Sequence, residues 1–163
     1  MWDQVQGKPA MVGCCAEIVQ HHRLPDDRMK VWTLGQQRFR VLEYVREKPY
    51  RVGLVEWIED HSPEKDLEPL AENVGQLLQD VVRLSAKLTG QQIELPDTMP
   101  ELPIELSYWI ASNLYGVAEE QQLLLEMQDT AARLEREVEI LTSTRNHLAA
   151  RTVLKETLED TLK

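Results

Sequence analysis

The chain has 163 residues, which is enough for one ordinary domain or for two small lobes with a real core. Its composition is that of a globular protein, and its net charge of −10 argues against general binding to nucleic acids or anionic membranes, since both require a cationic surface. No apolar run approaches the roughly 20 residues that span a bilayer, and the first ten residues lack the layout of a signal peptide.

The cysteines indicate the cellular compartment, and the charge distribution indicates how the chain is divided into lobes. Cys14 and Cys15 are the only cysteines, and neighbouring strand residues point to opposite faces, so we expect no disulfide and a reducing, cytoplasmic location. Residues 23–51 hold eight Lys or Arg against four Asp or Glu, whereas the rest of the chain holds ten against 24. This asymmetry indicates two lobes with different surfaces.

The first sixty residues are typical of short strands joined by tight links. The predicted strands are 12–20, 29–34, 38–45 and 50–60, with turns at 23–29 and 47–49 and a short connection at 35–37. An antiparallel meander or a small barrel is therefore expected.

The stretch "RFRVLEYV" raises the question of phosphate binding, because it carries two arginines. Strict alternation assigns its residues to two faces: Phe39, Val41, Glu43 and Val45 lie on one, and Arg38, Arg40, Leu42 and Tyr44 on the other. We expect Phe39, Val41 and Val45 to point inward. Because the chain is so acidic, Arg38 and Arg40 fit a solvated or ion-paired wall of a barrel better than a strand that binds the phosphates of a nucleic acid.

The character of the sequence changes near residue 61, after which helical spacing dominates. A first helix is predicted at 67–88, a proline-punctuated connection at 89–103, and a second helix at 103–115 that ends at Gly116. From about Ala118 a long helix carries a heptad seam of Leu124, Met127, Ala131, Leu134, Val138, Leu141 and Leu148. The pattern weakens after Asn146, which suggests a bend or a second short helix there.

The residues show no recognisable catalytic arrangement. There is no glycine-rich phosphate loop and no Gly-x-Ser-x-Gly motif. His21 and His22 diverge on a strand without further ligands nearby, so no metal site is expected, and no cofactor is predicted. Trp32 and Trp57 allow two interpretations: exposed anchors for a bound polypeptide, or core residues. With Tyr44, they are the candidate peptide-binding residues.

Residues 12–60 resemble the N-terminal substrate-binding domain of Lon-type ATP-dependent proteases. The family motifs correspond here to Gly13 with Ala16-Glu17-Ile18, Leu24-Pro25-Asp26, Gly35 with Arg38-Phe39, and Pro49-Tyr50 with Val55-Glu56. The stretch from Leu123 to Leu141 resembles the family's later helix, so the likeness covers about 12–141.

The resemblance implies an α+β fold: a small antiparallel, PUA-like β-barrel lobe, incomplete at its N-terminus, followed by an α-helical bundle with a long C-terminal helix. The expected domains are a β lobe at 1–62, a helical lobe at 63–145 and a helical extension at 146–163. Relative to the family pattern, we expect the chain to lack the ATPase and peptidase domains and the opening strands of the barrel. Either the chain is truncated or another polypeptide completes the sheet.

The resemblance implies a non-enzymatic module that recognises unfolded or partner polypeptides, as an adaptor for a separate protease or chaperone. The alternative is a scaffolding protein that pairs, as a homo-oligomer or with a partner, through the long C-terminal helix. A plastid stroma is the expected location if the source is eukaryotic. Neither nucleic acid nor membrane is expected as a partner.

Overall fold

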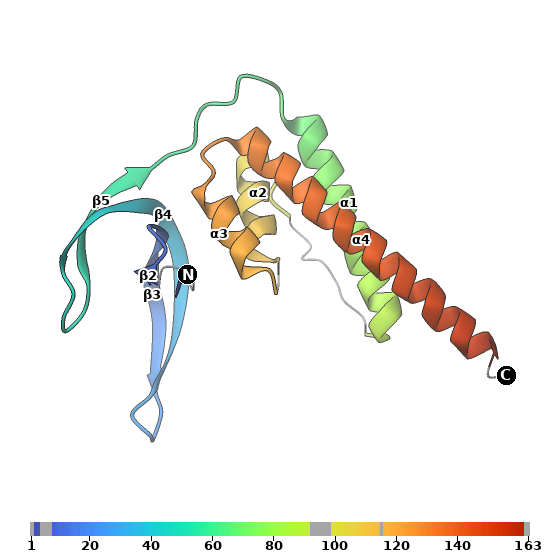
Figure 1. Cartoon of the computed structure of the whole chain (residues 1–163), viewed down its shortest axis with the longest axis horizontal. Coiled ribbons are helices and arrows are strands. Elements are labelled where there is room, and N and C mark those ends of the chain that lie inside the picture. The colour runs from blue at the N-terminus through green and yellow to red at the C-terminus, as the bar shows by residue number, and fades with distance from the viewer. Residues whose placement is uncertain (1, 4–7, 92–98, 115, 162–163) are drawn as a thin grey trace. The chain divides into compact units, whose positions relative to one another are not determined.

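The computed structural model describes residues 2–3, 8–91, 99–114 and 116–161, and Figure 1 shows the order of the elements. The chain divides into two compact units. Unit 1 comprises residues 1–60 and 118–128, and unit 2 comprises residues 61–117 and 129–163. Unit 1 is built on an antiparallel sheet and unit 2 is helical, which confirms the α+β class. The predicted domain boundaries stay a prediction.

Unit 1 contains a three-stranded sheet in the order β3-β4-β5. The strands are β3 (Val12–Arg23), β4 (Met29–Arg46) and β5 (Val52–Ile58), and a small separate sheet pairs β1 (Trp2–Asp3) with β2 (Lys8–Pro9). The predicted turn between β3 and β4 is confirmed, since the Leu24 N–H donates to the Arg28 carbonyl at 2.7 Å and Asp27 has a φ of 65°. The antiparallel meander is therefore present.

The predicted connection at 35–37 is wrong, because β4 runs through it without interruption. Cys14 pairs with Arg38 but Ala16 pairs with Gly35, so β4 carries one extra residue at this point. Such a bulge bends a strand and increases its twist without ending it. The glycine and the two glutamines that suggested a turn therefore lie in a bent part of one long strand.

Two further bulges change which residues of β4 share a face. Val41 pairs with Val55 and Glu43 with Leu54, which leaves Leu42 extra; Tyr44 pairs with Gly53 and Arg46 with Val52, which leaves Val45 extra. The strict alternation expected from the sequence therefore fails after Val41. Val45 is 62% exposed and not inward, and Tyr44 joins the face of Phe39.

Arg38 connects the sheet to α3 (Ala118–Glu126), the helix of unit 1. Its guanidinium forms an ion pair with Asp60 and donates to the carbonyls of Leu125 and Met127 at 2.6 and 2.7 Å. A cation at this position satisfies carbonyls at the C-terminal end of α3 and opposes the negative end of its dipole. The Arg38 and Asp60 side chains are 6% and 5% exposed, so the expected wall arginine is ion-paired but buried.

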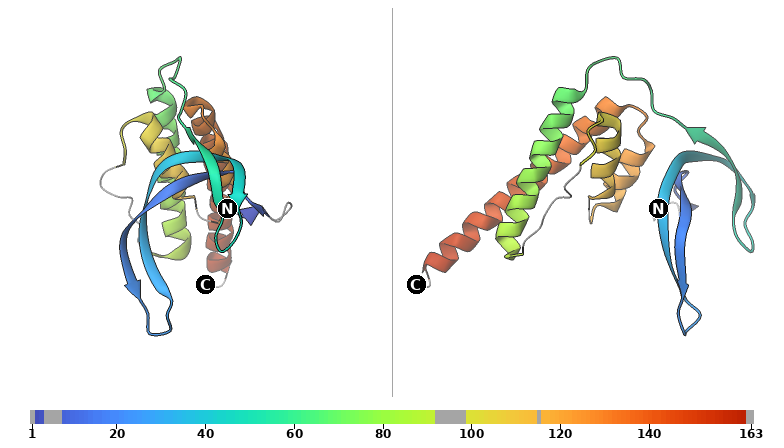
Figure 2. Two further views of the ribbon diagram at one scale, coloured as in Figure 1. Left: turned by 90° about the vertical axis from the view of Figure 1, so that its left-hand side faces the viewer. Right: turned by 180° about the vertical axis from the view of Figure 1, so that it is seen from behind.

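Unit 2 is built on two long helices that run side by side, α1 (Glu68–Thr89) and α4 (Thr130–Thr161), with the shorter α2 (Pro103–Ser112) packed on α4 (Figure 2). α1 begins after Leu67 with Pro69 in its first turn and ends at Gly90, which has a left-handed φ of 71°. Both ends agree with the prediction. The buried apolar residues of the unit are Leu67, Ala71, Val74, Leu77, Leu78, Leu106, Ile110, Leu114, Leu134 and Leu141.

The other helix boundaries correct the sequence predictions. α2 ends at Ser112, not at Gly116, because the Asn113 side chain donates to the Trp109 carbonyl and terminates the helix. The expected long helix from Ala118 is interrupted between α3 and α4, where the Asp129 carboxylate accepts the backbone N–H of Ala131 at 2.8 Å. α4 then continues past residue 146 as one helix. Part of the predicted connection at 89–103 lies outside the described residues.

A buried polar cluster lies between α2 and α4. Arg133 is fully buried; its guanidinium donates to the Ser107 hydroxyl at 2.9 Å and stacks 3.9 Å from the centre of the Tyr108 ring. One turn later, Glu137 is also fully buried, and neither of its carboxyl oxygens has a hydrogen-bond partner among the described residues. Burial raises the pKa of Glu137 to about 8, and the charge of Arg133 only partly opposes this.

Candidate functional site

A pocket of about 430 Å³ lies on one face of the curled sheet of unit 1, whose bending strands are visible in Figure 1. Its lining is mostly apolar and comes from the end of β2 with the residue after it, the first residues of β3, the second half of β4, and β5 with the residue before it. The lining residues are Pro9, Ala10, Val12, Gly13, Phe39, Val41, Tyr44, Arg51, Gly53 and Val55.

The strand register explains why these residues meet. Phe39 lies opposite both Gly13 and Trp57, Val41 opposite Val55, and Tyr44 opposite Gly53; directly paired residues share a face of an antiparallel sheet. Arg38 precedes Phe39 and therefore points to the opposite face, where it reaches the end of α3. One face of the sheet is thus attached to a helix, and the other carries the pocket.

Two glycines provide the space for the large side chains. A Cβ on Gly13 would lie 2.8 Å from the Phe39 Cζ atom, and a Cβ on Gly53 would lie 3.1 Å from the Glu43 carbonyl oxygen and 3.2 Å from the Val41 Cγ1 atom. The Phe39 ring therefore occupies the place of a Gly13 side chain. Glycine inside a strand marks this kind of close approach.

We predict that Gly13→Ala lowers the free energy of unfolding of unit 1 by about 1–3 kcal/mol, the usual cost of overpacking. The added methyl group and the half-buried Phe39 ring cannot both keep their positions. Hydrogen exchange of the β3 and β4 amides measures the effect within this unit.

Gly35→Ala is the matched control. It adds a methyl group to the same pair of strands, but the new Cβ meets only the Cys14 Sγ atom, at an ordinary 3.5 Å. We expect a change below about 1 kcal/mol, as for an exposed strand position. Equal losses of stability in the two variants would contradict the packing described for Phe39.

The structure places the three predicted binding residues in different surroundings. Tyr44 is half-buried and lines the pocket. Trp57 is 56% exposed and lies two residues beyond Val55, on the same face of β5. Trp32 is 48% exposed and lies on the arm formed by the far ends of β3 and β4, roughly 20 Å along the strand from Phe39. Both tryptophans are therefore exposed in this unit, and the core interpretation is wrong.

Sequence reasoning missed most of the pocket. Phe39 and Val41 were expected to point inward but not to form a site, and the roles of Gly13, Gly53 and Arg51 were not foreseen. The available signal was the pair of glycines inside strands, each opposite an aromatic residue.

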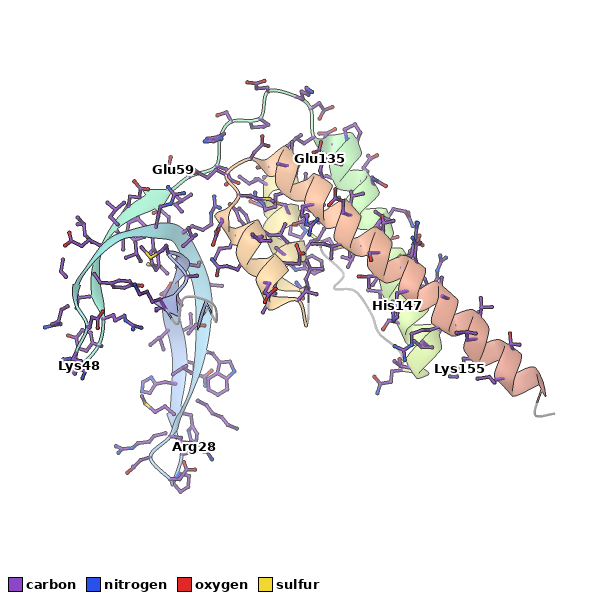
Figure 3. The ribbon with its side chains drawn as sticks, in the orientation of Figure 1. Arg28, Lys48, Glu59, Glu135, His147 and Lys155 are labelled. Carbon is purple, nitrogen blue, oxygen red and sulfur yellow. The ribbon has the colours of Figure 1, made fainter. Side chains whose placement is uncertain are left out.

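The arm of β3 and β4 near Arg28 projects its side chains on both faces, as Figure 3 shows. Several of them are apolar and exposed: Ile18, Val19, Met29, Val31, Trp32 and Leu34. A run of exposed apolar side chains of this size is typical of an interaction surface.

The described residues contain no group of three or more His, Cys, Asp or Glu side chains placed to hold a metal ion. Within the same residues, every helix is too short or too polar to cross a bilayer. His21 and His22 pair with Val31 and Lys30 across the arm, in a strand where neighbours face opposite ways.

Comparisons with known proteins relate the fold to a family. The family model described as the ATP-dependent protease La (LON) substrate-binding domain matches residues 3–143. A Lon protease of Anaeromyxobacter dehalogenans is 33% identical over 139 residues, and Lon protease 2 of Myxococcus xanthus is 32% identical over 139 residues; each alignment covers 84% of this chain. The chain spans only 16% and 17% of the length of these two relatives.

A solved structure has the same overall fold. It is the crystal structure of a Lon N-terminal domain protein from Xanthomonas campestris, with a TM-score of 0.53 and 22% sequence identity, covering 78% of this chain and 66% of that one. At this identity the likeness concerns the fold alone. With the family match over residues 3–143, it leads to one conclusion: the chain belongs to the LON substrate-binding domain family.

Proposed function

We propose that unit 1 binds apolar segments of unfolded or partner polypeptides in the pocket of its sheet, without catalysing a reaction on them. The observation that supports this proposal is the pocket itself, whose lining is mostly apolar in an otherwise acidic chain. Membership of a substrate-binding family supports this function. An adaptor role for a separate protease or chaperone, in the cytoplasm, is part of the proposal.

Binding would rest mainly on burial of apolar surface and therefore be weakly selective for sequence. Phe39, Val41 and Tyr44 line the pocket, and Trp57 extends the same face along β5. β5 is also one of the two edge strands of this three-stranded sheet, so an extended segment can add backbone hydrogen bonds while its side chains contact the pocket face. Trp32 on the arm would contact the same polypeptide farther along.

The test compares two aspartate substitutions on adjacent residues of β5. Val55 lines the pocket, whereas Leu54 points to the other face of the strand; both are exposed, so both variants should fold. We expect Val55→Asp to weaken binding of a reduced, carboxymethylated test protein by about tenfold, because a charge would be buried against apolar surface. Leu54→Asp should change the affinity by less than about twofold.

Fluorescence anisotropy of the labelled test protein gives both dissociation constants, and circular dichroism verifies that the variants are folded. The proposal fails if the unmodified chain shows no binding at tens of micromolar protein. It also fails if the two aspartate variants lose affinity equally.

A second candidate function, assembly through α4, is favoured by the last turns of that helix. Leu154 and Leu158 are exposed and, with Leu88 and Leu148, line a groove of about 680 Å³ between α1 and α4. The predicted heptad residues Leu134 and Leu141 are instead buried within unit 2, so the seam as predicted is not available to a partner. Sedimentation of Leu154→Ser/Leu158→Ser against the unmodified chain tests this: an unchanged oligomeric state excludes assembly through this groove.

A further inference from the structure

The arm of unit 1, residues 17–34, is a ribbon of two strands. In the described sheet β5 pairs with β4 only from Arg38 onward, so β3 and β4 have no third strand beside them in the arm. Every residue of the arm except Leu24 is exposed. A two-stranded ribbon is at best marginally stable in water unless one of its faces packs against something. The pattern of side chains on each face therefore bears on what covers the arm.

The strand register divides the arm into two different faces, because directly paired residues share a face and neighbours along a strand do not. One face, which we call the tryptophan face, consists of three rows from the base of the arm to its tip: Leu34 with Glu17, Trp32 with Gln20, and Lys30 with His22. The rows of the other face are Thr33 with Ile18, Val31 with His21, and Met29 with Arg23.

The tryptophan face carries opposite charges at its two ends. Glu17 lies in the base row and Lys30 in the tip row, with Trp32 midway between them. Successive rows are two residues, or about 7 Å, apart. The Glu17 carboxylate accepts a hydrogen bond from the Gln36 amide at 2.9 Å and remains exposed. The rows of the other face contain no carboxylate, so the tryptophan face alone combines an apolar centre with an anion and a cation.

A surface with this pattern is complementary to itself. A two-fold axis that lies across the strands at Trp32 places the base row of one copy over the tip row of a second copy, and the reverse. Glu17 of each copy then meets Lys30 and His22 of the other, and the two Trp32 rings meet at the axis. Self-complementarity of this kind is what a two-fold interface between identical chains requires.

We propose that the tryptophan face of the arm binds the same face of a second copy of this chain and forms a two-fold dimer. Burial of the two indole rings stabilises the contact, and the two charged rows set its antiparallel direction. The face is roughly 20 Å long and two strands wide, which is less than the roughly 800 Å² per partner of a standard interface. The dimer is therefore weak and reversible, with a dissociation constant of tens of micromolar or more.

This inference goes beyond the proposed polypeptide binding and gives Trp32 a second partner. A polypeptide that extends from the pocket along the arm and a second copy of the chain both need the Trp32 ring. The two therefore compete for the arm, whereas the pocket itself is not part of the dimer contact.

Sedimentation velocity of the full chain, from about 5 to 500 µM, tests the dimer. We expect a shift from monomer to dimer with concentration that weakens as salt is added. Glu17→Lys and Lys30→Glu should each weaken self-association by about tenfold, because each gives both charged rows the same sign. An equal mixture of these two variants should restore association, because each variant carries the charges that complement the other.

A pair of adjacent residues tests which face is used. Trp32 and Val31 are both 48% exposed but lie on opposite faces of the arm. Trp32→Ser should weaken self-association by at least about tenfold, and Val31→Ser, the matched control, by less than about twofold. Circular dichroism verifies that the variants are folded.

Three outcomes would overturn the proposal: a chain that stays monomeric at 500 µM, a mixture of the charge variants that associates no better than either alone, or equal effects of the two serine variants. Self-association that Leu154→Ser/Leu158→Ser removes and Trp32→Ser leaves intact belongs to the groove of α1 and α4, and also overturns it. Failure of the dimer leaves the proposed function standing, because Val55→Asp tests polypeptide binding separately.

Discussion

Replacing Arg38 with methionine is expected to lower the free energy of unfolding of unit 1 by about 3–5 kcal/mol, the usual cost of removing one member of a buried ion pair. Three acceptors lose a donor at once: the Asp60 carboxylate and the carbonyls of Leu125 and Met127. Hydrogen exchange of the β4 amides reports the opening of this unit separately from that of unit 2.

Arg40→Met provides the comparison on the same strand. Arg40 pairs with Glu56 at 2.8 Å, but these side chains are 41% and 46% exposed, and a pair so accessible to water contributes at most about 1 kcal/mol. Arg38→Lys should lie between the two, because lysine keeps the charge but lacks the planar fork that reaches several acceptors. A similar loss for Arg38→Met and Arg40→Met would show that the buried contacts do not stabilise the unit.

The stability of unit 2 is expected to fall as the pH rises, because of Glu137. Its pKa is about 8 in the folded chain against a reference of 4.5, so between these values the folded state holds a proton that the unfolded state has released. This contribution to stability is complete below pH 4.5 and is lost progressively up to about pH 8. Glu137→Gln removes the titration and should stabilise the unit, relative to the unmodified chain, by an amount that grows with pH to about 2–4 kcal/mol.

Thermal unfolding followed by circular dichroism at several pH values measures this difference, since unit 2 is helical. Glu135→Gln is the control: Glu135 lies two residues earlier on α4, is exposed, and is labelled in Figure 3. Its replacement should leave the pH dependence unchanged. An identical pH profile for the Glu137→Gln variant and the unmodified chain would rule out a buried, protonated Glu137.

The elements that local sequence determines were predictable. The turn around Asp26 and Asp27 and the ends of α1 at Leu67 and Gly90 depend on residues close together in the chain. The family motifs led to the α+β fold, which the structure confirms. Their positions along β3, β4 and β5 also place the pocket residues on strands, although not on a common face.

The features that could not be predicted from the sequence depend on residues far apart in the chain or on β-bulges. Arg38 is buried because it meets carbonyls 87 and 89 residues farther along the chain. Tyr44 joins Phe39 because extra residues in β4 reset the alternation, and no local pattern marks where a bulge will fall. The break before α4 was missed because the apolar spacing continues across it, while Asp129 ends the continuity by capping the new helix.

The assignment of α3 to unit 1 also fixes an order of events during synthesis. The strands of the sheet are made first, but the helix end that satisfies Arg38 follows only after residues 61–117, which belong to unit 2. Until residue 128 has emerged from the ribosome, the carbonyl acceptors of Arg38 and the helix of this unit are not available to the sheet. A fragment ending after β5 would hold every pocket residue and still not be a finished unit.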